Sequence, residues 1–130
     1  MLEDEENSLT CQRWVKIMAD FSADGVWDKQ GELCHLADLP VSDALKQRIS
    51  AWIDWYDREA DADGPNVIPF DVRQFSEQGV AIARDVKREL TDWTVVYFDE
   101  RRCNESILEG GPANRSYFEY EVKVGDVGDQ

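Results

Sequence analysis

The segment 70–90 carries the clearest helix signal in the chain and limits the folds that the rest can adopt. Asp71 suits the N-cap position, and Gln74, three residues later, suits its capping-box partner. Phe70 and Phe75 have the spacing of a hydrophobic staple. Apolar residues then recur every three or four positions, which predicts an amphipathic helix with one buried face. This stripe comprises Val72, Phe75, Gly79, Ile82, Ala83, Val86 and Leu90.

A second amphipathic helix is expected from Ser42, a natural N-cap, to about residue 60. Gly64 and Pro65 in the following segment cannot continue a helix comfortably. Gly79 lies on the apolar side of the 71–90 helix, where glycine costs about 1 kcal/mol relative to alanine. We therefore expect a close helix crossing at Gly79. The buried stripe of the 42–60 helix comprises Leu45, Ile49, Trp52, Ile53 and Tyr56.

Three segments have the composition of β-strands. Residues 14–21 and 117–124 alternate apolar and polar side chains, which is typical of a strand with one solvated face. Residues 93–98 are β-branched or aromatic almost throughout and predict a central strand, followed by a long polar connection over 99–116. The order is β-α-α-β-β. It predicts an α+β domain with a three-stranded or slightly larger, mainly antiparallel sheet, both helices on one face, and a hairpin of the last two strands.

The length of 130 residues suits one domain. We expect residues 1–11 to form a flexible acidic arm, residues 12–124 to form the domain, and residues 125–130 to fray. Within the domain, residues 26–39 are expected to be irregular or briefly extended, with Trp27 and Leu33 packed over the edge of the core.

The number and spacing of the cysteines favour a cytoplasmic location for the protein. Cys11, Cys34 and Cys103 are odd in number and lack CxxC spacing, so they indicate neither a closed disulfide framework nor a zinc ribbon. The acidic N-terminus has no apolar run of the kind that a secretory signal needs, and no stretch reaches the length of a membrane-spanning helix. We therefore expect a cytoplasmic protein.

The net charge limits the kinds of molecule that the chain can bind. The chain carries 28 acidic and 14 basic residues, a net charge of -14. Such a field repels nucleic acid and anionic membranes and attracts a basic protein, including one that itself binds nucleic acid. Direct binding to nucleic acid or a membrane is therefore not expected, although a charge of this size also serves plain solubility.

The sequence offers little for catalysis. One histidine, His35, cannot supply a multi-histidine metal site, and its side chain points away from that of Cys34 on an extended backbone. Asp61, Asp63 and Asn66 loosely follow calcium-loop spacing, but Asn66 replaces the required glycine and Val72 the bidentate glutamate. We expect no enzyme activity, catalytic residue, metal site or cofactor. A small hydrolase built around Cys103 or a carboxylate pair stays a third alternative.

The end of the 42–60 helix is the best candidate for a binding surface. Trp52 and Tyr56 fall within its buried stripe, whereas Trp55 falls at the wet boundary beside several carboxylates. An aromatic anchor with a charged rim is typical of a protein-binding patch, and a boundary residue covered by the following loop is the alternative. The candidate residues are Asp54, Trp55, Asp57, Glu59, Asp61 and Asp63, with Asp99, Glu100 and Glu105 of the polar connection as a second set.

Several segments together resemble a family. The stretches ADFSADGVWD (19–28), DLPVSDALKQRISAWIDWYD (38–57), FDVRQFSEQGVAIARDVKREL (70–90) and DWTVVYFDE (92–100) are similar to small bacterial proteins, some of which look like immunity proteins of polymorphic or contact-dependent growth inhibition toxins. The resemblance covers about residues 14–123. It implies a protein that neutralises a cognate toxin by occluding its active-site or substrate surface. It supplies no catalytic residue.

Together these features predict a cytoplasmic immunity protein with an acidic face for a basic, nuclease-like toxin domain. Trp55 would anchor the contact, and the carboxylates would pair with lysine and arginine side chains of the toxin. The alternative is a non-catalytic regulatory or adaptor module for an endogenous basic protein. A toxin gene immediately upstream would favour the first hypothesis, and an isolated gene the second.

Overall fold

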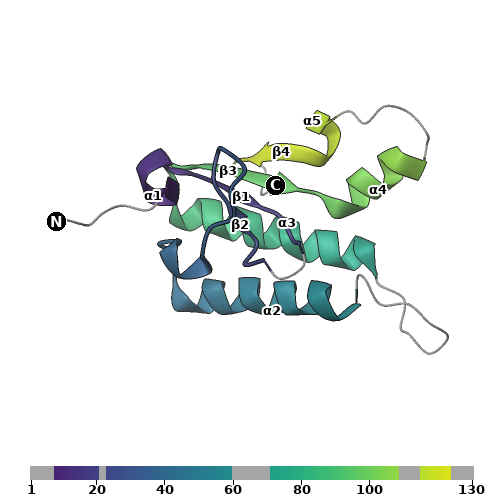
Figure 1. Ribbon diagram of the computed structural model, residues 1–130, viewed down its shortest axis with the longest axis horizontal. Helices are drawn as coiled ribbons and strands as arrows, with labels where there is room; N and C mark the ends of the chain where they lie inside the picture. Colours follow the sequence, from purple (N-terminus) through teal and green to yellow (C-terminus); the bar gives the residue numbers. More distant parts are fainter. Residues whose placement is uncertain (1–7, 21–22, 60–70, 109–114, 124–130) are drawn as a thin grey trace.

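The computed structural model of the chain describes residues 8–20, 23–59, 71–108 and 115–123, apart from the side chains of residues 107 and 108 (Figure 1). Its elements are α1 (Ser8–Gln12), β1 (Trp14–Ile17), β2 (Val26–Trp27), the 3-10 helix η1 (Leu36–Asp38), α2 (Asp43–Glu59), α3 (Val72–Glu89), β3 (Thr94–Phe98), α4 (Glu100–Leu108), α5 (Arg115–Phe118) and β4 (Glu119–Val122).

The strands form one mixed sheet in the order β2-β1-β3-β4. β1 pairs with β2 and β3 pairs with β4 in antiparallel fashion, whereas β1 and β3 run parallel. The expected α+β class is confirmed, and so is the antiparallel pairing of the last two strands, although α4 and α5 lie between them. The expected three-stranded or slightly larger, mainly antiparallel sheet is wrong, because the four strands form a mixed sheet with a parallel central pair. Between the parallel strands β1 and β3 the chain passes through α2 and α3. Parallel neighbours require such a long crossover connection. β2 is too short to show a sequence period.

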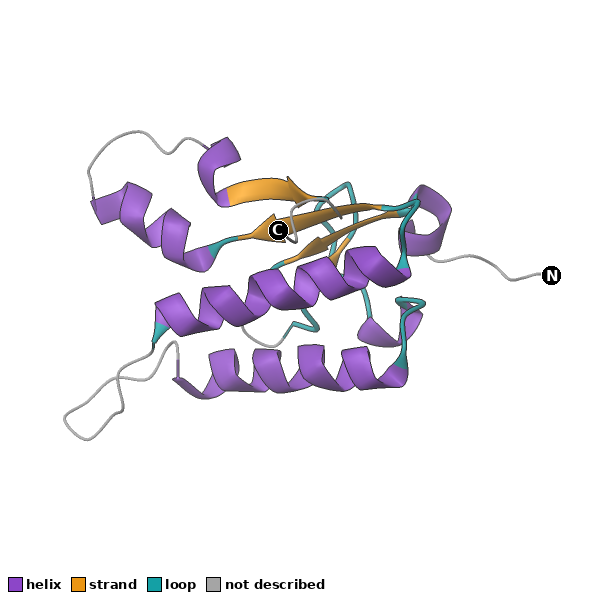
Figure 2. Cartoon of the chain, turned by 180° about the vertical axis from the view of Figure 1, so that it is seen from behind, coloured by secondary structure: helices purple, strands orange, loops and turns teal. Residues whose placement is uncertain are grey.

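Both long helices lie on the same side of the sheet, with α3 nearer to it (Figures 1 and 2). Their predicted starts are confirmed. Ser42 Oγ accepts from Leu45 N at 3.2 Å, and Asp71 Oδ1 accepts from Gln74 N at 3.0 Å. Each cap satisfies a backbone N–H that the first helical turn leaves without a partner. Among the described residues, none of the helices combines the length and the hydrophobicity needed to cross a bilayer.

Aromatic packing joins α2, α3 and β3. The rings of Trp52 and Phe75 are stacked with centroids 4.5 Å apart, and Trp52 Nε1 donates to Phe75 O at 3.0 Å. Gly79 of α3 has no side chain, so Trp52 of α2 and Tyr97 of β3 can approach its Cα. Its close contact is therefore with two aromatic side chains from neighbouring elements. Trp52 and Tyr97 are both buried, which places this contact in the core.

The expected polar connection over 99–116 is wrong, because the structure has α4 and α5 there. Asp99 caps α4, as its Oδ1 accepts from Arg102 N at 3.2 Å. Arg101 N donates to Ser76 Oγ at 3.0 Å, which ties the first turn of α4 to α3. These contacts support a helix that lacks a long apolar stripe.

Two smaller expectations fail near the N-terminus. Residues 8–11, assigned to the flexible arm, belong to α1, and Leu9 is completely buried. A single apolar side chain gives no periodic signal, so only the packed structure reveals its role. Leu33 is exposed, although Trp27 is half-buried as expected. The remaining arm residues 1–7, the Asp61–Asp63 stretch and the tail 125–130 lie outside the described residues.

Candidate functional site

Asp54 and Asp57 lie together on one side of α2. A helix turns about 100° per residue, which leaves positions 54 and 57 about 60° apart. Both side chains line a groove of about 260 Å³ that Asp24 also borders. We call this groove, which Ala23, Asp24, Leu36, Ser50, Ile53, Asp54 and Asp57 line, the acidic groove. It combines three carboxylates with the apolar side chains of Ala23, Leu36 and Ile53.

Trp55 faces the other side of the buried stripe of α2. Its half-buried ring packs edge-on against Phe75, with centroids 5.2 Å apart and planes at 73°. Trp55 Nε1 donates to Glu59 Oε1 at 2.9 Å. The indole lines a second groove, between α2 and α3, with Arg48 and Gln78. The structure thus groups Trp55 with Glu59 and separates both from Asp54 and Asp57.

Two carboxylates of the second predicted set, Asp99 and Glu105, are already engaged within the fold. Asp99 is 2% exposed, and its Oδ2 accepts from the Tyr120 hydroxyl at 2.9 Å. Glu105 accepts from Arg101 Nη1 at 2.8 Å and from the Tyr117 hydroxyl at 2.9 Å. These contacts hold α4 and α5 against β4. They show structural roles that the sequence did not indicate.

Two of the carboxyl groups on α4 have pKa values shifted in opposite directions. Burial raises the pKa of Glu100, and the negative charges of Asp20 and Asp99 add to the effect. The hydrogen bond from Tyr117, followed by that from Arg101, lowers the pKa of Glu105. Glu100 therefore sits where its anion is unfavourable, and Glu105 where its anion is stabilised.

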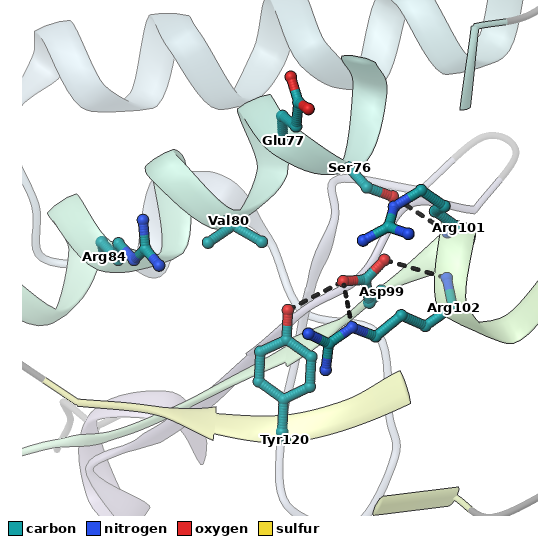
Figure 3. A pocket seen from close by; sticks show the side chains of 8 residues that line it. All are labelled: Ser76, Glu77, Val80, Arg84, Asp99, Arg101, Arg102 and Tyr120. Atoms are coloured by element: carbon teal, nitrogen blue, oxygen red, sulfur yellow. Dashed lines mark hydrogen bonds and ion pairs between the residues drawn. The ribbon is translucent and has the colours of Figure 1, made fainter. Parts of the chain in front are cut away.

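A pocket between α3, α4 and β4 was not foreseen from the sequence. Its volume is about 300 Å³. Figure 3 shows Arg101 and Arg102 on either side of Asp99, with Arg84 beyond Val80. We call it the arginine pocket; Ser76, Glu77, Val80, Arg84, Asp99, Arg101, Arg102 and Tyr120 line it. From the sequence alone, Arg84 belongs to the solvated face of α3. Only the packing of α4 and β4 against α3 shows that it lines a pocket.

Arg102 and Tyr120 form the wall of the arginine pocket. The Arg102 guanidinium carbon lies 5.0 Å from the ring centroid of Tyr120 and 5.1 Å from that of Tyr117. Arg102 Nε also lies 3.7 Å from Asp99 Oδ2. Burial and the nearby charge of Asp99 raise the pKa of Tyr120, while Arg102 and Arg84 act in the opposite direction. The Tyr120 hydroxyl is therefore protonated at neutral pH and donates to Asp99.

The cysteines lack the environment of an activated nucleophile. Burial raises the pKa of the Cys34 and Cys103 thiols, which keeps both protonated at neutral pH. Cys11 and His35 are exposed. Within the described ranges, no three His, Cys, Asp or Glu side chains gather as ligands of a metal ion would.

Comparison with protein families agrees with the resemblance seen in the sequence. Residues 13–100, more than half of the 130-residue chain, match a family described as Serratia CdiI immunity protein-like. No curated protein sequence matches the chain. The matched range contains the acidic groove, and it contains Arg84 and Asp99 of the arginine pocket.

Proposed function

The chain belongs to the Serratia CdiI immunity protein-like family, and on this premise we propose that it binds a cognate protein toxin and blocks it through the acidic groove. Binding alone would neutralise the toxin, by covering its active-site or substrate surface. The observation that carries the proposal is the acidic groove, which Asp24, Asp54 and Asp57 line together with apolar side chains, within a chain of net charge -14.

The toxin that best suits this surface is a nuclease. A nuclease holds the phosphates of its substrate with lysine and arginine, so its substrate surface is basic. Carboxylates of the acidic groove would take the places of those phosphates, and the charge of the whole chain would speed encounter. Nucleic acid itself is repelled by the same field.

The size of the acidic groove fits a side chain of a partner protein. Pockets for small molecules usually measure about 300–1,000 Å³, and this groove measures about 260 Å³. One lysine or arginine side chain of the toxin would lay its methylene groups on Leu36 and Ile53 and bring its charge to the carboxylates. Asp61 and Asp63, outside the described residues, and Trp55 with Glu59 on the far side of the buried stripe would extend the contact.

An inhibition assay tests this function. The toxin domain encoded beside the gene of this chain is purified, and its cleavage of plasmid DNA and of transfer RNA is followed with increasing amounts of the chain. We expect cleavage of one of these substrates to stop at an equimolar ratio. A toxin that cleaves neither substrate would contradict the nuclease assignment. A toxin that stays fully active and unbound in excess chain would contradict the immunity function itself.

A further inference from the structure

Arg84 is a half-buried cation whose charge lacks a partner among the described residues. Its Nε atom is buried and has no hydrogen-bond partner in the described part of the chain. Buried donors without a partner are uncommon in native proteins, because withdrawing one from water costs about 1–3 kcal/mol. Arg84 also lines the arginine pocket. A pocket that holds such a side chain is a candidate site for a ligand that brings a negative charge to the same guanidinium.

The other charges of the arginine pocket are matched in pairs. Arg102 Nε lies 3.7 Å from Asp99 Oδ2, and Arg101 Nη1 lies 2.8 Å from Glu105 Oε2. The remaining carboxylate of the lining belongs to Glu77, whose Oε2 lies 3.6 Å from Arg73 Nε on the solvent side of α3. Among the described residues, no carboxylate forms an ion pair with Arg84, so its positive charge is in excess within the pocket.

The pocket suits a single carboxylate better than a polyanion. A net charge of -14 repels nucleic acid, yet the surplus charge of Arg84 is local and lies in an open pocket of about 300 Å³. If a basic protein carries one acidic side chain at its contact surface, the overall attraction between the two proteins would bring that side chain to the arginine pocket. Guanidinium groups pair with carboxylates through two parallel hydrogen bonds, which fixes orientation as well as charge.

We propose that the arginine pocket receives one aspartate or glutamate side chain of the toxin, which pairs with the guanidinium of Arg84. This inference rests on the proposed function and adds a second contact of opposite charge to the acidic groove. A basic toxin without a carboxylate at this place would leave Arg84 unpaired in the complex. The pocket thus favours the cognate toxin over other basic proteins, which the acidic groove alone attracts equally.

Binding measurements with three variants test the proposal. Arg84→Gln removes the charge, Arg84→Lys keeps the charge without the planar fork, and Arg13→Gln removes the charge of an arginine outside the pocket, whose side chain is 66% exposed. The Kd of each variant for the purified toxin domain is measured by calorimetry. We expect Arg84→Gln to raise the Kd about ten-fold or more and Arg84→Lys to have a Kd between those of the wild type and Arg84→Gln. The Kd of Arg13→Gln should stay within about two-fold of the wild-type value.

A stability measurement separates loss of contact from loss of fold. Because Arg84→Gln removes a half-buried cation that has no ion-pair partner among the described residues, its melting temperature should equal or exceed that of the wild type. Weaker binding together with unchanged or higher stability therefore supports a direct contact with the toxin. Wild-type affinity in Arg84→Gln would overturn the proposal.

Toxin variants identify the partner group. Each surface Asp and Glu of the toxin is changed in turn to Asn or Gln, and every variant is measured against the wild-type chain and Arg84→Gln. We expect one toxin variant to weaken binding to the wild type but not to Arg84→Gln, since the pair is already lost there. Additive losses for every toxin variant would overturn the proposal. Failure of the wild type and Arg13→Gln to bind the toxin would instead show that the proposed function is wrong.

Discussion

Asp54 and Trp55 are consecutive residues, yet they line grooves on either side of the buried stripe of α2. Asp54 borders the acidic groove with Asp57, whereas Trp55 packs against Phe75 and donates to Glu59. The sequence WIDWYD therefore combines a core segment, a packed boundary residue and an acidic surface. Stability and binding should consequently respond to different residues of this stretch.

Trp55→Ala should lower the free energy of unfolding by about 1–3 kcal/mol, less than the 3–5 kcal/mol typical of a fully buried tryptophan. The reason is the loss of its contact with Phe75. Asp54→Ala, at an exposed position on the same helix, should change stability by no more than about 0.5 kcal/mol. Urea unfolding monitored by circular dichroism measures both. Equal losses for the two variants would contradict the separation of these side chains.

Gly79→Ala should destabilise the protein although alanine favours helices. A Cβ at this position would lie 2.7 Å from Trp52 Cζ2 and would clash with the Tyr97 hydroxyl. Overpacking costs about 1–3 kcal/mol, against a gain of about 1 kcal/mol in helix propensity. We expect a net loss of up to about 2 kcal/mol. Ala81→Gly, at an exposed position of α3, measures the propensity term alone. A more stable Gly79→Ala variant would show that the two rings do not meet there.

Asp99→Ala should cost about 2–4 kcal/mol of unfolding free energy. The change removes the cap of α4 and the buried acceptor of the Tyr120 hydroxyl. Asp71→Ala is the matched control, because it removes the exposed N-cap of α3 and should cost about 1 kcal/mol. Thermal and urea unfolding compare the two variants. Similar losses would mean that the Tyr120 contact adds nothing beyond capping.

Glu100 and Glu105 should produce opposite pH dependences from the same helix. The raised pKa of Glu100 means that the folded state holds this proton more tightly than the unfolded chain, so its ionisation lowers stability as the pH rises through the folded-state pKa. The lowered pKa of Glu105 means that its ionisation adds stability above the unfolded-state pKa, which is lost as the pH falls through the folded-state pKa.

Glu100→Gln should therefore be more stable than the wild type at neutral pH, and Glu105→Gln less stable. Both differences should close at acidic pH, where all these carboxyl groups are protonated in folded and unfolded chains. Urea unfolding between about pH 3 and pH 7, which brackets the ordinary glutamate pKa of about 4.3, measures the differences. Differences of the same sign for the two variants would contradict the environments assigned to these side chains.

The sequence predicts the long helices well because their signals are local. Ser42 and Asp71 cap α2 and α3 as expected, and the buried stripe of α2 follows the predicted period. By contrast, α1 depends on the burial of Leu9, and α4 depends on Asp99 and on the contact of Arg101 with Ser76. Short helices that rest on tertiary contacts leave no periodic pattern.

The candidate surfaces likewise combine features that the sequence predicts with features that only the packed structure shows. The helical period places Asp54 and Asp57 on the surface of α2, but Asp24, which completes the acidic groove, comes from the turn before β2. Arg84 and Tyr120 line the same pocket only because β4 returns beside β3 and packs near α3. Spacing along one element predicts which side chains share a face, whereas pockets between elements need the topology.

The association rate of the toxin domain at low ionic strength is the decisive test of binding through the acidic groove. Stopped-flow measurements compare the wild type with Asp54→Lys/Asp57→Lys and with Glu32→Lys/Glu121→Lys, two exposed positions outside the acidic groove that undergo the same change of net charge. We expect the first pair to slow association about ten-fold or more and the control pair to have a much smaller effect. High salt should remove the difference. A wild-type rate in the first variant, or equal slowing in both, would contradict binding through the acidic groove.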